Sequence, residues 1–533
     1  MCIRFGEKFI SRILAFLGRL LGRWQGSAVA SGLFFCAFYA LLVNIPFWVA
    51  SRWLGLLPIG WFCLEYSVVG LLSLFAPRIL TVILLLLVIA ADLINAVCKT
   101  YYMAPKSCLA NVGGLCDFSG IRILYLAVVV FLIFLVVAIA AVIPPKAILR
   151  PIRWWAAMCL IGFVLVSVSA DYVAISHEAG LLVNPFRASR PNDTNKYGDR
   201  SNLWIGRYPS IRLRRDQQIF GRESHVSSSS AKDYPSMPSA TSAALGAAGI
   251  TTGRSAKELP DLVVIVVESW GLYEDSSVRN ALVQSYFQQE LLARYKLVQG
   301  TVPFIGPTVV GEARELCDST MGDHIIDANA HELQSCLPDR LARLGYHSVA
   351  IHGMSERMFD RRAWYERVGF QKRLFRDQLQ QQELPVCDGA FVGICDAAIA
   401  NQIGHSLETE RTYPEFVYWM TLGSHLPVSV PSGLPAGDSC SINPFLAQQP
   451  ALCSWYQLVA NVHESVSRLA MTTLSRPTVF VVVGDHAPPF ATPAIRDQFS
   501  QAAVPYLVLI PREGMPKGRE VASSAGQTRH RND

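Results

Sequence analysis

The sequence predicts five transmembrane helices followed by a water-soluble α/β domain, with a mostly parallel sheet and helices on both faces. Two observations lead to this fold class. Long apolar runs are confined to the first third of the 533-residue chain, and short β-branched runs alternate with helix-like segments after residue 260. The mean hydropathy of +0.29 therefore averages over two different parts. The net charge of +6 is modest for this length, and we expect no nucleic-acid partner.

The apolar runs are long enough to cross a membrane. A helix needs about 20 apolar residues to span the hydrocarbon core. The candidate spans are about 27–48, 54–76, 79–97, 121–143 and 154–175. They are apolar all round, whereas a helix on a soluble core has one apolar stripe. We therefore expect residues 1–175 to form a transmembrane domain.

The distribution of cations predicts the orientation of these spans, because cytoplasmic loops are enriched in Lys and Arg. The cations of the expected cytoplasmic segments are Arg4, Lys8, Arg12, Arg19, Arg23, Arg78, Lys146, Arg150 and Arg153. An odd number of spans then places the C-terminal half outside the cell. The small residues "SAVASG" precede the first apolar run, so we expect this run to be a signal anchor and not a cleaved signal peptide.

Cysteine usage agrees with an oxidising compartment. The C-terminal part contains an even number of cysteines: Cys317, Cys336, Cys387, Cys395, Cys440 and Cys453. We favour the sequential pairing 317–336, 387–395 and 440–453 among the connectivities allowed, because each pair closes a local loop. Cys108 and Cys116 are candidates for a fourth bridge. Metal-binding thiols are the alternative, but no two of these C-terminal cysteines have the close spacing of a zinc site.

Residues 176–260 are expected to be a linker. Its first part, 187–223, is rich in Arg and Lys. It is interpreted either as a solvated linker or as a segment that lies on anionic lipid head groups. Residues 226–256 are rich in Ser, Ala, Gly and Thr and are expected to be flexible. The polar tail 513–533 is expected to be loose.

The α/β domain is expected to cover 261–512. The predicted strands are 262–267, 347–352, 416–421, 478–483 and 504–510. Helix-like segments such as 280–295 and 337–344 lie between them. This alternation favours a mostly parallel sheet with helices on both faces.

Polar residues follow these strands at the edge where open α/β sheets carry their sites. "DLVVIVVESWG" ends in Glu268, and "TVFVVVGDHAPP" ends in Asp485 and His486. Thr308 opens a helical run in "GPTVVGEARELC", and His425 follows a strand in "LGSHLP". Taken singly, Glu268 is an ordinary structural acid, Thr308 a helix cap and His425 a surface residue. Together they predict a metal site at one sheet edge.

Each residue type has a chemical reason to be there. Oxygen and imidazole ligands without thiolate suit one divalent ion, Mn²⁺ or Zn²⁺ first, with Mg²⁺ also compatible. A Thr hydroxyl is a poor nucleophile until a metal or base activates it. A helix N-terminus at Thr308 favours a phosphoryl group. His425 is suited to move a proton to or from an oxygen.

The order of these motifs resembles the lipoteichoic acid synthase-like phosphotransferases, membrane members of the alkaline phosphatase and sulfatase superfamily. The matching pieces are "VVESWG", the Thr-x-x-x-Glu of "TVVGE", "HGMSERMFDRRAWYERVGF", "TLGSHLPV" and "VVVGDHAP". The five-helix anchor matches too. One departure is visible, because Val309 and Val310 follow Thr308 where the family has small polar residues. This departure bears on head-group preference.

The resemblance implies roles for individual residues. Glu268, Thr308, Asp485 and His486 would hold the metal, and Thr308 would become phosphorylated. Phe359 and Arg361 fall where the family places an aromatic ring and an arginine around the lipid head group. His425 falls where the family places a substrate-binding histidine.

The resemblance also implies the reaction and its location. The donor would be a membrane phospholipid and the acceptor a hydroxyl of an envelope glycan or lipid, with release of diacylglycerol. Phosphoglycerol is the favoured head group, and phosphoethanolamine transfer is the alternative. The expected location is the bacterial inner membrane, with a cytoplasmic N-terminus and a periplasmic catalytic domain.

Two further hypotheses remain open. "CLPDR" (336–340) matches the pattern at which sulfatases generate their modified nucleophile, which would make the chain a sulfatase or phosphodiester hydrolase. It precedes a helix that leads into a strand, and we expect Cys336 to lie in a disulfide. The second hypothesis is a non-enzymatic membrane protein on a retired enzyme fold. The complete set of expected ligands argues against it.

Overall fold

The computed structural model describes residues 28–37, 39, 43–44, 64–101, 152–176, 237–250, 255–319, 321–322, 324–428, 438–490 and 492–512. The chain divides into two compact units. The first comprises Met1–Leu109 and Gly120–Val226, and the second comprises Ala110–Ser119 and Ser227–Asp533.

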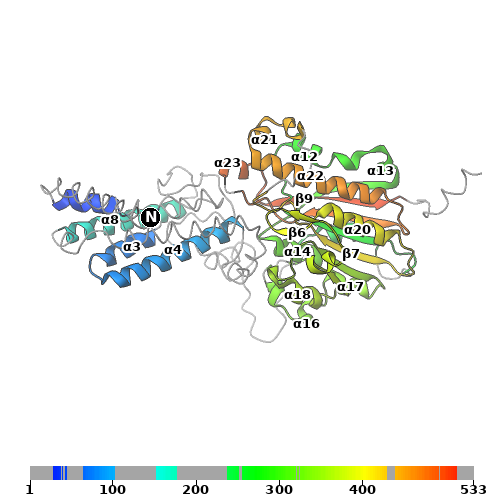
Figure 1. Ribbon diagram of the computed structural model, residues 1–533, viewed down its shortest axis with the longest axis horizontal. Coiled ribbons are helices and arrows are strands. Elements are labelled where there is room, and N and C mark those ends of the chain that lie inside the picture. The colour runs from blue at the N-terminus through cyan, green and yellow to red at the C-terminus, as the bar shows by residue number, and fades with distance from the viewer. Residues whose placement is uncertain are drawn as a thin grey trace, which may run out of the picture. The chain divides into compact units, whose positions relative to one another are not determined.

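The first unit is helical where it is described (Figure 1). Its helices include α3 (Leu64–Ser73), α4 (Arg78–Thr100) and α8 (Arg153–Ser176), and α3 packs on both of the others. Among the described residues, no helix combines the length and the apolar character that a membrane crossing requires. The predicted span 121–143 lies outside the described residues, as do parts of 27–48 and 54–76.

The second unit is built on a mixed sheet in which the central strands run parallel. The order of its strands is β2-β9-β8-β1-β7-β3-β4, and β5 and β6 form a separate hairpin. The strand bounds are β1 Asp261–Val267, β2 Tyr295–Pro303, β3 His347–His352, β4 Lys372–Leu374, β5 Val386–Asp388, β6 Val392–Ile394, β7 Glu415–Met420, β8 Thr478–Gly484 and β9 Ala503–Pro511. The predicted α/β fold class with a mostly parallel sheet is confirmed.

Strand β1 lies at the centre of this sheet. It is parallel to β7 on one side and to β8 on the other, with Val263 opposite both Val417 and Phe480. Every residue of β1 and of β8 is buried. β-branched residues pack well on a pleated surface that is covered on both faces. The sheet therefore brings the residues after β1 and β8 side by side.

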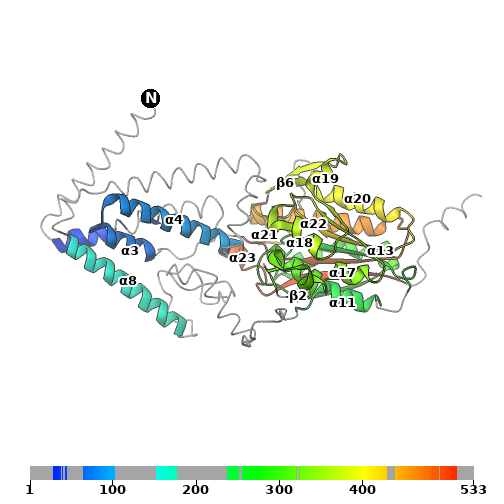
Figure 2. The ribbon, with the colours of Figure 1, turned by 90° about the horizontal axis from the view of Figure 1, so that it is seen from below.

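Helices cover both faces of the sheet, as predicted. Figure 2 shows α20 and α22 on one side and α11 and α17 on the other. The helix bounds are α11 Ala240–Ala247, α12 Ser276–Leu282, α13 Gln289–Arg294, α14 Thr308–Cys317, α15 His324–Asp327, α16 Ala330–Leu333, α17 Leu337–Ala342, α18 Arg361–Arg367, α19 Arg376–Gln380, α20 Asp396–Glu408, α21 Pro444–Gln448, α22 Pro450–Met471 and α23 Pro493–Arg496. Short 3-10 turns are η2 Gln284–Phe287, η3 Met358–Asp360 and η4 Asp438–Ile442.

Two parts of the secondary structure differ from the sequence prediction. The helix-like segment 280–295 is broken into α12, η2 and α13, because Val283 has non-helical backbone angles and Gln288 has extended ones. Strand β2 was not predicted. It is an edge strand with exposed Lys296, Gln299 and Thr301, and it pairs antiparallel with β9, about two hundred residues later in the chain. Its weak hydrophobic pattern reflects an edge position, where one side of a strand stays polar.

Residues 237–250 correct the prediction of a flexible segment over 226–256. Helix α11 forms there, with Ser239 as its N-cap and with Ala240, Ala244 and Leu245 buried. The backbone N–H and hydroxyl of Thr241 donate to Oε2 of the buried Glu315, at 3.0 and 2.7 Å. The Ser- and Ala-rich composition hides this helix because its stability depends on tertiary contacts and not on its own hydrophobic stripe.

Replacing Thr241 with Val should destabilise the second unit. The variant keeps the side-chain shape but removes the hydroxyl that donates to Glu315, and a hydrogen bond to a charged group contributes about 1.5–3 kcal/mol. We expect the urea midpoint of the purified protein to fall accordingly. Thr409→Val is the control, because Thr409 is exposed and its hydroxyl donates to the carbonyl oxygen of His405 on the same helix turn. Equal midpoints for the two variants would contradict the role of α11.

The predicted sequential disulfide pairing is confirmed for the described cysteines of the second unit. The bonded pairs are Cys317–Cys336, Cys387–Cys395 and Cys440–Cys453. The proposed bridge between Cys108 and Cys116 lies outside the described residues. Because Cys336 is bonded to Cys317, its thiol is not available as the precursor of a sulfatase nucleophile.

Candidate active site

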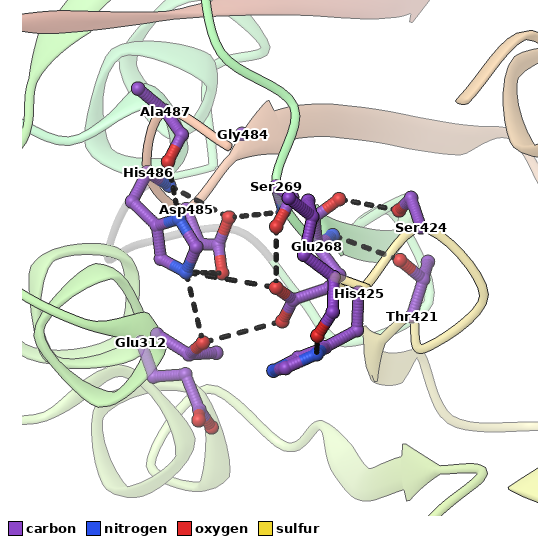
Figure 3. Close-up of polar contacts among 12 residues, drawn as sticks. Glu268, Ser269, Glu312, Thr421, Ser424, His425, Gly484, Asp485, His486 and Ala487 are labelled. Carbon is purple, nitrogen blue, oxygen red and sulfur yellow. Dashed lines mark hydrogen bonds and ion pairs between the residues drawn. The ribbon is translucent and has the colours of Figure 1, made fainter. Parts of the chain in front are cut away.

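Glu268 directly follows β1 and is buried at the edge of the sheet (Figure 3). The next residue, Ser269, has a left-handed backbone with φ of 56°. Its hydroxyl donates to Glu268 Oε1 at 2.8 Å, and its backbone N–H donates to Asp485 Oδ1 at 2.7 Å. Non-glycine residues rarely adopt this backbone conformation. The turn at Ser269 thus ties the acid after β1 to the acid after β8.

Asp485 and His486 follow β8 at the same edge. The backbone N–H of His486 donates to Asp485 Oδ1 at 2.7 Å. His486 Nδ1 lies 2.9 Å from the carbonyl oxygen of Ala487, so Nδ1 donates to this oxygen and Nε2 is the nitrogen on the side of the cluster. Gly484 is required here, because a Cβ at this position would lie 1.9 Å from the carbonyl oxygen of Trp270.

Thr308 is the first residue of α14 and is buried. Its Oγ1 donates to Glu268 Oε2 at 3.2 Å and lies 3.3 Å from His486 Nε2. Gly311, one turn further along, lets the helix approach the β8 turn closely, since a Cβ there would stand 3.0 Å from Cα of Asp485. The structure therefore brings Thr308, Glu268, Asp485 and His486 together from three separate elements.

The spacing of these polar atoms fits a metal ion. In a tetrahedral zinc shell, with bonds of about 2.0–2.2 Å, neighbouring ligand atoms are about 3.3–3.6 Å apart. Thr308 Oγ1 lies 3.2 Å from Glu268 and 3.3 Å from His486. His486 Nε2 lies 3.2 Å from Asp485 Oδ2 and 3.6 Å from Glu268 Oε1. One ligand atom each from Glu268, Asp485 and His486 falls within a 4.8 Å cluster.

The electrostatics of this cluster also call for a cation. Burial raises the pKa of Asp485 to about 7, and the neighbouring Glu268 carboxylate adds to the rise. The His486 imidazole and the backbone N–H groups of His486 and Ser269 act in the opposite direction. Asp485 Oδ2 accepts no hydrogen bond from the residues that the structure describes. Two buried acids side by side with an unsatisfied oxygen are best compensated by a positive ion.

His425 lies in the loop after β7, beside this cluster (Figure 3). The loop is joined to Glu268 at two points. The backbone N–H of Glu268 donates to Thr421 Oγ1 at 2.9 Å, and the hydroxyl of Ser424 donates to the Glu268 carbonyl oxygen. His425 is partly exposed, whereas the expected metal ligands are buried.

Arg361 is placed next to α14 by a buried ion pair. Its Nη2 and Nε donate to Glu312 Oε1 at 2.6 and 3.0 Å, and its guanidinium lies 5.2 Å from the centre of the Phe359 ring. Tyr365 and Tyr418 donate to the other Glu312 oxygen. The charge of Arg361 is thus balanced by Glu312. The expected contact of Arg361 and Phe359 with a lipid head group stays a prediction.

His352, which ends β3, was not among the predicted site residues. It is buried, with Nδ1 3.0 Å from the carbonyl oxygen of Met420 and Nε2 3.4 Å from Arg361 Nη1. Burial, followed by the charge of Arg361, lowers its pKa well below the usual range, so the imidazole is neutral. Its position at the end of a strand in "HSVAIH" was the available signal.

Arg314 was also missed, and it supports the β8 turn from behind. Its side chain is fully buried and pairs with Glu315 at 2.6 Å. Nη2 donates to the carbonyl oxygen of Gly484 at 2.6 Å, and Nη1 donates to that of Asp485 at 3.3 Å. The sequence carries little signal for this role, because an Arg-Glu pair in a helix is usually solvated.

Comparison with known proteins gives distant matches to solved structures. The lipoteichoic acid synthase LtaP from Listeria monocytogenes is 13% identical, covering 52% of this chain and 72% of its own, with a TM-score of 0.37. Phosphoglycerol transferase GacH from Streptococcus pyogenes is 14% identical, with coverages of 52% and 76% and a TM-score of 0.31. The zinc complex of the periplasmic domain of EptC from Escherichia coli is 14% identical, with coverages of 49% and 74% and a TM-score of 0.33.

No curated protein is similar enough in sequence to count as a match. The sulfatase family model matches residues 260–530, a range that includes all the helices and strands given above for the second unit except α11. The superfamily predicted from the motifs is therefore confirmed. Because the matched residues make up about half of the 533-residue chain, the protein belongs to the sulfatase family.

Proposed function

We propose that the protein is a metal-dependent phosphotransferase that moves a phospholipid head group through a phosphothreonine intermediate. The observation that carries this proposal is the cluster in which the Thr308 hydroxyl stands within 3.3 Å of both Glu268 and His486 at the N-terminus of α14. A hydroxyl held beside metal ligands and a helix N-terminus has the surroundings of a phosphoryl-accepting nucleophile.

The proposed reaction has two steps. Thr308 Oγ attacks the phosphorus of the lipid phosphodiester, the bond from phosphorus to the diacylglycerol oxygen breaks, and that oxygen takes up a proton. An acceptor hydroxyl then displaces Thr308 and loses its own proton. Thr308 loses its hydroxyl proton, which points to Glu268 Oε2, and regains a proton when it is displaced. We assign to His425 the proton that the leaving oxygen gains in the first step and the proton that the acceptor hydroxyl loses in the second. The N-terminal dipole of α14 favours the anionic phosphoryl group.

Glu268, Thr308, Asp485 and His486 are proposed to hold one divalent ion, Mn²⁺ or Zn²⁺ first. Such an ion would lower the pKa of the Thr308 hydroxyl and offset the phosphoryl charge. His486 offers Nε2 because Nδ1 is engaged with Ala487. The protein supplies the fixed placement of the nucleophile and the exclusion of water around it.

Glu268→Gln should therefore remove the metal and leave the fold. Gln keeps the volume and one carbonyl oxygen but loses the charge that a divalent ion needs in a buried site. Metal analysis should fall from about one ion per chain towards zero, with unchanged circular dichroism. Glu274→Gln is the control, because Glu274 is exposed. Wild-type protein that binds well below one ion after metal loading would instead favour a non-enzymatic protein.

Phosphoglycerol is the proposed head group, because the motifs around Glu268, Thr308 and Asp485 follow the lipoteichoic acid synthase pattern. Phosphoethanolamine is the second candidate, because the three disulfides of the second unit resemble the disulfide-rich domain of the sibling phosphoethanolamine transferase family. Purified protein should be incubated with labelled phosphatidylglycerol or phosphatidylethanolamine, with and without chelator. Release of diacylglycerol from one lipid, abolished by chelator, identifies the donor. The absence of release from both contradicts the proposed transferase.

We also propose that the catalytic unit is held at the outer face of the bacterial inner membrane, with an envelope glycan or lipid as acceptor. The support is the set of apolar runs in the sequence, together with exposed apolar side chains on α4 and α8. Ile79, Leu87 and Leu165 are 74%, 62% and 61% exposed. Recovery of the protein in the membrane fraction after an alkaline carbonate wash tests this placement, and release into the supernatant contradicts it.

A further inference from the structure

Asp396 is a buried acid outside the proposed metal cluster, at the first position of α20. Its Oδ2 accepts the backbone N–H of Gly423 at 2.7 Å. The backbone N–H of Leu422 lies 3.1 Å from Oδ1 and 3.2 Å from Oδ2. No cationic side chain of the described residues contacts it. Burying a carboxylate without a counter-ion costs free energy, and the hydrogen bonds from the two backbone N–H groups offset this cost.

The loop that Asp396 holds is the one that carries His425. On its other side this loop is joined to Glu268 through Thr421 and Ser424. Asp396 therefore adds a further attachment to a segment of only five residues, 421–425, whose Thr421 N–H also donates to the Val266 carbonyl oxygen at 3.0 Å. A Cβ at position 423 would stand 2.9 Å from Asp396 Oδ2, so a larger residue there would push the carboxylate away from the Gly423 N–H.

The imidazole of His425 is placed by the Leu426 carbonyl oxygen, which its Nδ1 contacts, and by the segment just before Asp396. Its ring packs edge-on against Phe391, with centroids 4.7 Å apart, and its backbone N–H donates to the Leu422 carbonyl at 3.1 Å. The side chains of Leu422 and Phe391 belong to one buried apolar cluster. The disulfide Cys387–Cys395 closes the hairpin that carries Phe391, and Asp396 is the next residue.

We infer that Asp396 is a positioning residue for His425. It fixes the backbone N–H groups of Leu422 and Gly423, three and two residues before His425, and so sets where the imidazole stands relative to Thr308 and Glu268. This inference rests on the proposed function, because the proton that His425 moves belongs to the transfer reaction. Asp396 itself touches neither the proposed metal ligands nor the reacting atoms.

The test is Asp396→Asn in the full chain, with Asp377→Asn as the matched control. Asp377 is an exposed acid of α19 and its side chain is 72% exposed. The substitution at Asp396 replaces one carboxylate oxygen with an amide nitrogen, which cannot accept, so a single uncharged oxygen is left for the N–H groups of Leu422 and Gly423. A displacement of about 1 Å can reduce rates by about 100-fold. We expect diacylglycerol release to fall about 10- to 100-fold, with the metal content unchanged, and no change for the control.

A double-mutant cycle separates positioning from a general loss of structure. In a His425→Ala background, Asp396→Asn should lower the rate less than twofold further. An equal loss in both backgrounds, or no loss in the wild-type background, overturns the inference. Gly423→Ala disturbs the same contact from the loop side and replaces Asp396→Asn if that variant does not fold.

A spectroscopic readout keeps the inference testable apart from the reaction. If wild-type protein releases diacylglycerol from neither lipid, the proposed function fails. The NMR ring resonances of His425 in histidine-labelled protein then test whether Asp396 positions the imidazole. They should shift in Asp396→Asn and stay in place in Asp377→Asn. Unchanged His425 resonances in both variants overturn the inference whatever the reaction.

Discussion

Thr308→Ala is expected to abolish diacylglycerol release, with a loss on the order of 10³-fold or more, because it removes the nucleophile itself. The fold should be unaffected, since among the described residues the Thr308 side chain makes polar contacts only with Glu268 and His486. The measurement is the initial rate with the labelled lipid that serves as donor, at saturating metal.

Two comparisons sharpen this prediction. Thr308→Ser keeps a hydroxyl and should retain measurable activity, whereas Thr301→Ala, on the exposed side of β2, should match the wild type. Mass spectrometry of wild-type protein trapped with donor lipid should find the head-group phosphate on the peptide that contains Thr308. Turnover that survives Thr308→Ala, or a phosphate on another residue, would refute the phosphothreonine mechanism.

Arg314→Met is expected to destabilise the protein strongly. It leaves Glu315 buried without its counter-ion and removes the donors from the carbonyl oxygens of Gly484 and Asp485. Breaking one side of a buried ion pair costs about 3–5 kcal/mol. The free energy of unfolding measured in urea should fall by that amount, and metal affinity should fall with it, because the β8 turn carries Asp485 and His486.

Arg468→Met is the matched control for this variant. Arg468 forms an exposed pair with Glu464 one turn away, with each side chain 59% exposed. Such a pair contributes about 0.3–0.5 kcal/mol. Similar destabilisation by the two Arg→Met variants would mean that the buried network around Arg314 is not what holds the turn.

The structure shows which kinds of sequence signal were informative. The β1 and β8 strands were recognisable because a strand buried on both faces must be apolar throughout. Their polar ends stood out against those runs, which made Glu268, Asp485 and His486 visible as candidates. Thr308 could be proposed because it opens a helical run between the motif that ends in Glu268 and the motif that contains Asp485 and His486. The local disulfide pairs followed from the short loops that they close.

The functional residues that the sequence did not reveal have one kind of contact in common. Arg314, His352 and Asp396 each act through backbone carbonyl or N–H groups of distant segments. Such contacts leave no periodic pattern, because any polar residue at the right place can make them. Helix α11 was misjudged for a related reason, since its stability comes from Glu315 in α14 and Asp318 directly after it, and not from its own composition.

The sequence by itself determined the class of fold, the disulfides and the identity of the residues at the strand ends, because burial and alternation are local properties of the chain. Only the tertiary structure decided that Thr308 lies 3.2 Å from Glu268 Oε2 and that Arg361 is paired with Glu312. It also showed how the loop of His425 is held. Distances between segments hundreds of residues apart depend on how the sheet and its helices pack. No local pattern encodes that packing.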